Sequence, residues 1–137
     1  MKKIILTFLF LFIGFVAFAQ TPEEKADLLT SEMNTLLSLT AEQQVMVKIT
    51  NRVYYRKNAL LIEKRDSKYG YPAIIAGTST LSSQEQEAIL NKVNQVTEER
   101  KTIHKNRTKL NLTPAQYQIY LQNIDRLFEL VTTQLGE

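Results

Sequence analysis

Apolar residues recur at helical spacing through most of the chain, and this pattern predicts an all-α protein. The longest interruption is the segment Tyr69-Gly70-Tyr71-Pro72, and the residues that follow it, 73–80, show no helical period. We therefore expect a loop there and four helices in total, of which the two central ones are long. The expected helices cover about residues 21–37, 40–66, 82–109 and 114–135.

A seven-residue pattern occurs at two of the expected helix junctions. Residues 37–43 and residues 110–116 both read Leu-x-Leu-Thr-x-x-Gln. Threonine is a good N-cap, and a glutamine three residues later can accept a hydrogen bond from the N–H of the capping residue, which makes a capping box. The leucine before each threonine is placed to pack on the first turns of the new helix. Each copy therefore predicts a corner at which one helix ends and another begins.

The repeated pattern resembles the motif of the Spy/CpxP-like L-T-x-x-Q family of small bacterial envelope proteins. The resemblance implies a single all-helical domain over residues 20–137, built from repeated helix–corner–helix units and forming a cradle-like homodimer. It also implies a periplasmic, ATP-independent chaperone-like protein that binds unfolded or stressed envelope proteins. Two other functions stay open: a regulatory module that docks on the periplasmic domain of an envelope-stress sensor kinase, and a metal-responsive accessory protein. The matching positions are Leu39, Thr40, Gln43, Leu112, Thr113 and Gln116.

The second expected helix is apolar on more than one side. A four-helix chain has few neighbours to cover such a helix, so we expect a dimer partner to cover part of it, with a client protein as the alternative. One apolar stripe consists of Val45, Met46, Ile49, Val53 and Leu60, and a second consists of Val47, Tyr54 and Leu61. The clearly polar arc holds Lys48, Asn51, Arg52 and Asn58.

The third expected helix carries arginines in its apolar line, which runs through Ile89, Val93, Val96, Ile103 and Leu110. Arginine is rarely buried without a partner. Arg100 and Arg107 therefore either extend past the core edge or pair with Glu98 or Glu99, or else they mark a surface that is both apolar and cationic. A surface that is both apolar and cationic would suit unfolded acidic chains. The candidate client-binding residues are Arg52, Tyr54, Arg56, Leu61, Arg100 and Arg107.

Residues 1–19 have the pattern of a secretory signal peptide. Lys2 and Lys3 precede an apolar run that ends in Ala17-Phe18-Ala19, so we expect cleavage after Ala19 and no membrane insertion afterwards, with an N-terminal anchor as the alternative. The full sequence has 17 basic and 14 acidic residues. Loss of the two lysines leaves 15 against 14, a net charge of +1, and this balance together with export argues against nucleic acid as a partner.

The sequence favours a binding protein over an enzyme. It has one histidine and no cysteine, and it contains no metalloprotease, nucleophile-elbow or phosphate-loop motif. His104 lacks a second histidine or a carboxylate three or four residues further on, so a metal site has little support. We expect no catalytic residue and no cofactor.

Overall fold

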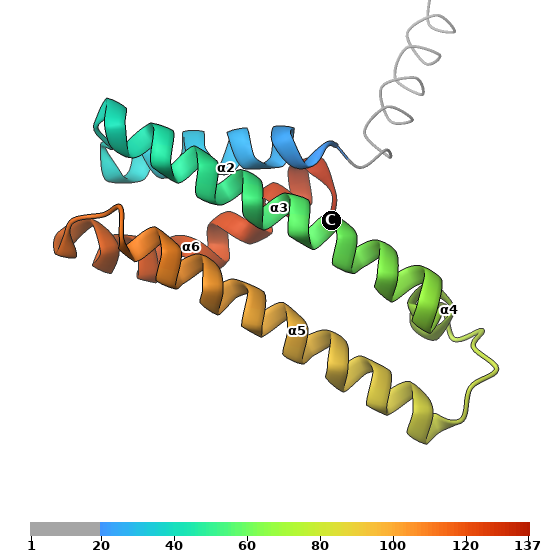
Figure 1. Ribbon diagram of the computed structural model, residues 1–137. Helices are drawn as coiled ribbons and strands as arrows, with labels where there is room; N and C mark the ends of the chain where they lie inside the picture. The colour runs from blue at the N-terminus through green and yellow to red at the C-terminus, as the bar shows by residue number, and fades with distance from the viewer. Residues whose placement is uncertain (1–19) are drawn as a thin grey trace, which may run out of the picture.

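The computed structural model describes residues 20–137, and helices account for most of them (Figure 1). The all-α prediction is therefore confirmed for this part of the chain, and the expected signal peptide lies outside the described residues. The expected ends of the long helices agree with the observed ones to within about three residues. The helices are α2 (Pro22–Leu37), α3 (Ala41–Tyr69), α4 (Tyr71–Ala76), α5 (Ser83–Lys109) and α6 (Pro114–Leu135).

The prediction of four helices was wrong, because the expected loop contains the short helix α4. Gly70 ends α3 with a left-handed φ of 60°, and Gly77 ends α4 with a φ of 74°. Pro72 lies in the first turn of α4, where its missing N–H leaves no helical bond unmade. A helix of six residues is too short to show a helical period, so the sequence revealed only the break.

The helices form a compact end and a projecting hairpin (Figure 1). At the compact end, α2 packs along α3 and against α6. The second half of α3 and the first half of α5 extend beyond this end, joined by α4 and a loop. The hydrophobic core therefore lies at the compact end. Its buried residues are Ala26, Leu29, Met33, Leu37, Leu39, Val47, Tyr54, Tyr55, Tyr120, Ile124, Leu127, Phe128 and Val131.

The two repeated motifs form the predicted capping boxes and also bind each other. Thr40 and Thr113 each accept a hydrogen bond from the backbone N–H of the glutamine three residues later, and each glutamine side chain accepts one from the N–H of its threonine. The amide of Gln43 donates to Oε1 of Gln116 at 2.7 Å, and the amide of Gln116 donates to Oε1 of Gln43 at 3.2 Å. The sequence predicted two separate corners, whereas the fold joins them into one unit.

Each glutamine amide also donates to a backbone carbonyl at the other corner. Gln43 donates to the carbonyl of Asn111 at 3.0 Å, and Gln116 donates to the carbonyl of Leu37 at 3.2 Å. The last carbonyls of a helix have no partner within the helix. Gln116 therefore caps the end of α2, whereas Gln43 binds the turn that follows α5.

We expect Gln43→Ala to lower the free energy of unfolding by about 1–2 kcal/mol, because it removes a helix cap and hydrogen bonds between the two corners. Gln116→Ala should have a similar effect. The double variant should lose less than the sum of the two, since both glutamines belong to one network. Denaturant unfolding followed by circular dichroism measures these losses. Gln118→Ala, at an exposed site on α6, is the control, and strictly additive losses would contradict the linked network.

Candidate binding groove

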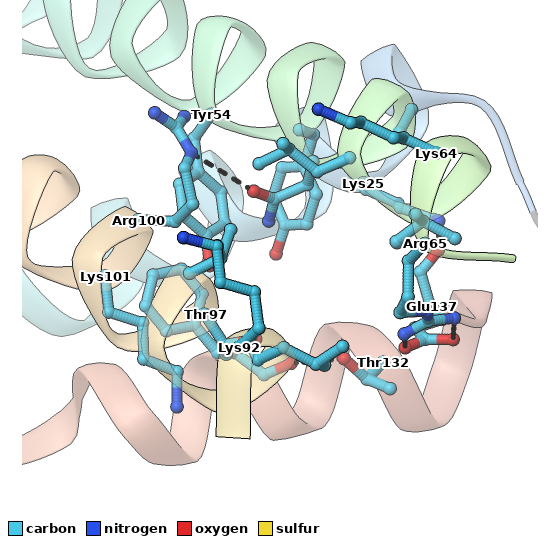
Figure 2. Close-up of a pocket in the computed structure, with 18 of the residues that line it drawn as sticks. Lys25, Tyr54, Lys64, Arg65, Lys92, Thr97, Arg100, Lys101, Thr132 and Glu137 are labelled. Atoms are coloured by element: carbon cyan, nitrogen blue, oxygen red, sulfur yellow. Dashed lines mark hydrogen bonds and ion pairs between the residues drawn. The ribbon is translucent and has the colours of Figure 1, made fainter. Parts of the chain in front are cut away.

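A groove of about 920 Å³ lies between α3, α5 and α6 (Figure 2). Its size falls within the range of small-molecule binding sites in proteins, roughly 300–1,000 Å³. No apolar residue of α5 is fully buried within the described chain, so this helix covers the groove without closing it. Apolar lining residues include Leu61, Ile62, Ala88, Ile89, Val93, Val96 and Phe128.

Cationic side chains outnumber carboxylates around the groove. Lys64, Lys92 and Arg100 have no carboxylate within ion-pair distance anywhere in residues 20–137. Of the lining carboxylates, that of Glu137 binds Arg65, whereas Asp125 and Glu129 are exposed and make no ion pair within residues 20–137. The groove wall therefore combines apolar surface with unneutralised positive charge. Its cations are Lys25, Lys64, Arg65, Lys92, Arg100 and Lys101, against the carboxylates of Asp125, Glu129 and Glu137.

The contacts of Arg100 distinguish between pairing with a neighbouring glutamate and forming a surface that is both apolar and cationic. Its Nε donates to Oδ1 of Asn58 at 3.4 Å, and its guanidinium carbon lies 5.6 Å from the ring centre of Tyr54 (Figure 2). It makes no ion pair with Glu98, which pairs instead with Lys101 at 3.7 Å. Partial burial lowers the pKa of Arg100. This arginine therefore contributes charge to a surface that is both apolar and cationic.

The structure brings together only three of the six candidate client-binding residues. Tyr54, Leu61 and Arg100 line the groove. Arg107 is exposed on α5 and does not line it. The other two arginines face α2, where Arg52 lies 3.5 Å from Asp27 and Arg56 lies 2.7 Å from Glu23. Of the four candidate arginines, only Arg100 therefore lies at the groove.

The two apolar stripes of α3 have different surroundings. Val47 and Tyr54 of the second stripe are buried, and Leu61 lines the groove. The first stripe, here named the outer stripe, is exposed along its whole length, from 39% for Val53 to 63% for Leu60. The sequence predicted two apolar sides but could not say which would be covered within one chain. The outer stripe consists of Val45, Met46, Ile49, Val53 and Leu60.

The expected polar arc of α3 and the expected apolar line of α5 were both partly wrong. Asn51, assigned to the polar arc, is fully buried. Ile103 of α5 is 37% exposed and Leu110, directly after the helix, is 84% exposed, while the buried positions of α5 are His104 and Thr108. The side of α5 that faces the core is thus rotated towards its polar residues, because those residues find hydrogen-bond partners on other helices.

A buried chain of hydrogen bonds, here named the polar chain, connects α6, α5, α3 and α2. His104 lies with Nδ1 2.6 Å from the hydroxyl of Tyr120 and Nε2 2.7 Å from Oδ1 of Asn51. The amide of Asn51 donates to Oγ1 of Thr30 at 2.9 Å, and that hydroxyl donates to the carbonyl of Ala26 at 2.7 Å. Sequence reasoning missed this chain, although a histidine beside Arg100 in an apolar line was its one visible sign.

The hydrogen bonds of the polar chain all point in one direction. Because the amide of Asn51 donates to Thr30, its Oδ1 must accept from Nε2–H of His104. Nδ1 of a neutral histidine then accepts from the Tyr120 hydroxyl. Burial lowers the pKa of His104 to about 3, and the cations of Arg100 and Lys105 act in the same direction. The imidazole is therefore neutral over the physiological pH range.

One end of the groove is closed by Glu137. Its carboxylate accepts hydrogen bonds from both terminal nitrogens of Arg65, at 2.5 and 3.0 Å, and its backbone carbonyl accepts one from the ammonium of Lys25 (Figure 2). The guanidinium of Arg65 also lies 4.1 Å from the ring centre of Tyr71. The hydrogen bonds from Arg65 lower the pKa of Glu137. No sequence pattern indicated this contact, which joins residues 72 positions apart.

Neither a membrane span nor a metal cluster is found in the described part of the chain. No helix within residues 20–137 has the length and apolar character needed to span a bilayer. The same residues contain no cluster of three histidine, cysteine or acidic side chains arranged to hold a metal ion. Neither a model of a known protein family, nor a curated protein, nor a solved structure matches this chain.

Proposed function

We propose that this protein is a periplasmic chaperone-like protein that binds unfolded or stressed envelope proteins in the groove without ATP. The observation that carries the proposal is the combination, in one open groove, of apolar walls and cations that have no carboxylate partner. Unfolded chains expose apolar side chains together with acidic ones. A groove of this kind can hold many sequences weakly, because it does not depend on a fixed arrangement of polar partners.

The two properties of the groove contribute to different steps of binding. The charge of Arg100, Lys92 and Lys64 raises the rate at which acidic chains arrive. Apolar contacts with Leu61 and Val93 determine how long a bound segment stays, since most differences in affinity appear in the dissociation rate. Client side chains would enter the groove while the client backbone stays in water at its open side.

We also propose that the protein is a homodimer whose subunits meet through the outer stripe. Four exposed large apolar side chains lie on consecutive turns of α3, from Val45 to Val53, and a fifth, Leu60, lies two turns further on. Exposed apolar surfaces of this kind mark interaction sites. The groove lies on the other side of α3, where Tyr54 and Leu61 point. Covering the outer stripe would therefore leave the groove accessible.

The client proposal predicts separate kinetic effects for a charge and for an apolar side chain of the groove. Arg100→Ser should slow association with a chemically denatured acidic client severalfold at low salt and flatten its salt dependence. Leu61→Ser should leave association nearly unchanged and raise the dissociation rate about 3- to 10-fold through lost apolar contact. Stopped-flow binding with a labelled client, together with suppression of aggregation of two unrelated clients, measures both effects.

Arg107→Ser is the matched control, because Arg107 is an arginine of the same helix that lies outside the groove. It should change the association rate less than Arg100→Ser does. The proposal would be abandoned if the wild-type protein suppressed the aggregation of neither client. Binding of one folded partner at a fixed stoichiometry, without suppression of aggregation, would support the regulatory alternative instead.

The dimer proposal predicts that light scattering at tens of micromolar gives twice the mass of one chain. The double variant Ile49→Asp/Val53→Asp should be monomeric, because it places charge at the centre of the outer stripe, where burial would leave it unpaired. Its helix content should match that of the wild type, since both side chains are already exposed in one chain. A monomeric wild type at these concentrations would refute this arrangement.

A further inference from the structure

The helices that line the groove have no free backbone groups to pair with a polypeptide backbone, and part of the wall is apolar. It is built from the side chains of long helices, in which backbone N–H and C=O groups already pair with each other. An extended peptide brings two polar backbone groups per residue, and these lose free energy when they leave water without partners. A hydrocarbon chain carries no such groups. The deep, apolar part of the groove is therefore better suited to a hydrocarbon chain than to a peptide backbone.

The cations without carboxylate partners indicate the charge of the molecule that would occupy the groove. Arg100 lies beside Tyr54, and Lys92 lines the groove from the same helix (Figure 2). The lining holds six cations against three carboxylates, and Arg100 and Lys92 make no ion pair within residues 20–137, so an anion is favoured beside them. A planar guanidinium can donate two parallel hydrogen bonds to one carboxylate.

The opposite end of the groove already holds a carboxylate of the chain itself. Glu137 binds Arg65 with both side-chain oxygens, and its backbone carbonyl binds Lys25, which is only 7% exposed. This end thus already holds a carboxylate in contact with its cations, whereas Arg100 makes no ion pair with any carboxylate of residues 20–137, the lining Asp125 included. This difference favours Arg100 as the hydrogen-bond donor to an outside anion.

We propose that the groove binds a small acidic amphiphile, that is, a molecule with one carboxylate headgroup and an unbranched hydrocarbon chain. The headgroup lies against Arg100 and Lys92, and the hydrocarbon chain lies along Leu61, Ile62 and Val93. This binding activity goes beyond the holding of unfolded proteins and does not depend on it.

Decanoate is the probe, and decyltrimethylammonium, which has a tail of the same length and the opposite charge, is its control. Calorimetric titration of the full mature protein below the micelle concentrations should give one decanoate per chain and at least tenfold weaker binding of the cation. Arg100→Gln should weaken decanoate binding about tenfold. Lys92→Gln, at an exposed position, should weaken it severalfold and serves as the second variant if the first disturbs the fold. Lys57→Gln is the matched control, because Lys57 is a lysine of α3 outside the groove.

The position of the bound probe gives an independent test. In methyl-resolved NMR spectra, decanoate should shift the signals of Leu61, Ile62 and Val93, and leave those of Val45 and Ile49 in place. Equal affinity for the two probes, shifts confined to the outer stripe, or unchanged binding by both Arg100→Gln and Lys92→Gln would overturn the proposal. So would dissociation of a dimer into monomers by decanoate, because a second copy of the chain would then be the native occupant. None of these outcomes depends on whether clients are held, so the two proposals fail separately.

Discussion

Replacing His104 by alanine is expected to lower the free energy of unfolding by about 4 kcal/mol. The substitution empties a fully buried site, and truncation of a large buried side chain costs about 3–5 kcal/mol. It also leaves the hydroxyl of Tyr120 and the side-chain oxygen of Asn51 without their hydrogen-bond partner. Each buried polar group without a partner adds about 1–3 kcal/mol to the loss of stability unless it reorients. Total stabilities of domains this size are about 5–15 kcal/mol, so this one substitution would remove a large fraction of the total.

The measurement is denaturant unfolding at fixed protein concentration, with Asn106→Ala as the matched control. Asn106 is an exposed residue of α5, two positions from His104, and its replacement should change the free energy of unfolding by less than about 0.5 kcal/mol. Asn51→Leu should be strongly destabilising by itself. Combined with His104→Leu, it should cost less than the sum of the single changes, because the two residues share a hydrogen bond. A loss below about 1 kcal/mol for His104→Ala would show that the polar chain contributes little.

Acidification from pH 7.5 to pH 5 is expected to lower the free energy of unfolding by about 2 kcal/mol through His104 alone. In the unfolded chain a histidine takes up a proton near pH 6.5, whereas burial lowers the pKa of His104 in the folded protein to about 3. Between these values the unfolded state binds more protons than the folded state. Stability therefore falls with pH below about 6.5, with a limiting slope of about 1.4 kcal/mol per pH unit.

The pH window from 7.5 to 5 separates this effect from the titration of carboxylates. The pKa values of Glu23 and Glu137 are lowered in the folded protein by Arg56 and Arg65, so the stability that these carboxylates contribute is lost only below their ordinary value of 4.5. His104→Gln removes the titrating group and should give a nearly flat profile over this window. A wild-type profile that is equally flat would mean that the folded protein accommodates the protonated histidine.

The exposed and buried sides of α3 show why the candidate site was predicted only in part. Tyr54 and Leu61 were singled out because they repeat every seven residues, and both line the groove. Arg56 was grouped with them as a cation of the same helix, but it pairs with Glu23 of α2. A periodic pattern gives the angle between side chains around one helix. It does not say which side of the helix faces which neighbouring helix.

The hydrogen bonds of His104 show a second limit of the sequence. Burying a polar side chain is unfavourable unless it finds a partner, and the partners of His104 lie 53 positions earlier at Asn51 and 16 positions later at Tyr120. No sequence pattern indicated that these three residues would form hydrogen bonds with each other. The apolar positions Ile103 and Leu110 were therefore assigned to the core in place of His104 and Thr108.

The sequence by itself determined the all-α class of the described chain, the extents of its four long helices and both capping boxes. These features depend on residues within one or two helical turns of each other, so the information is local. The tertiary structure alone decided the docking of Gln43 against Gln116, the polar chain through His104, and the contact of Glu137 with Arg65. Each of these joins residues that are 16 or more positions apart. The groove belongs to this second group, because its walls come from three helices whose relative rotation is fixed by side-chain packing and buried hydrogen bonds.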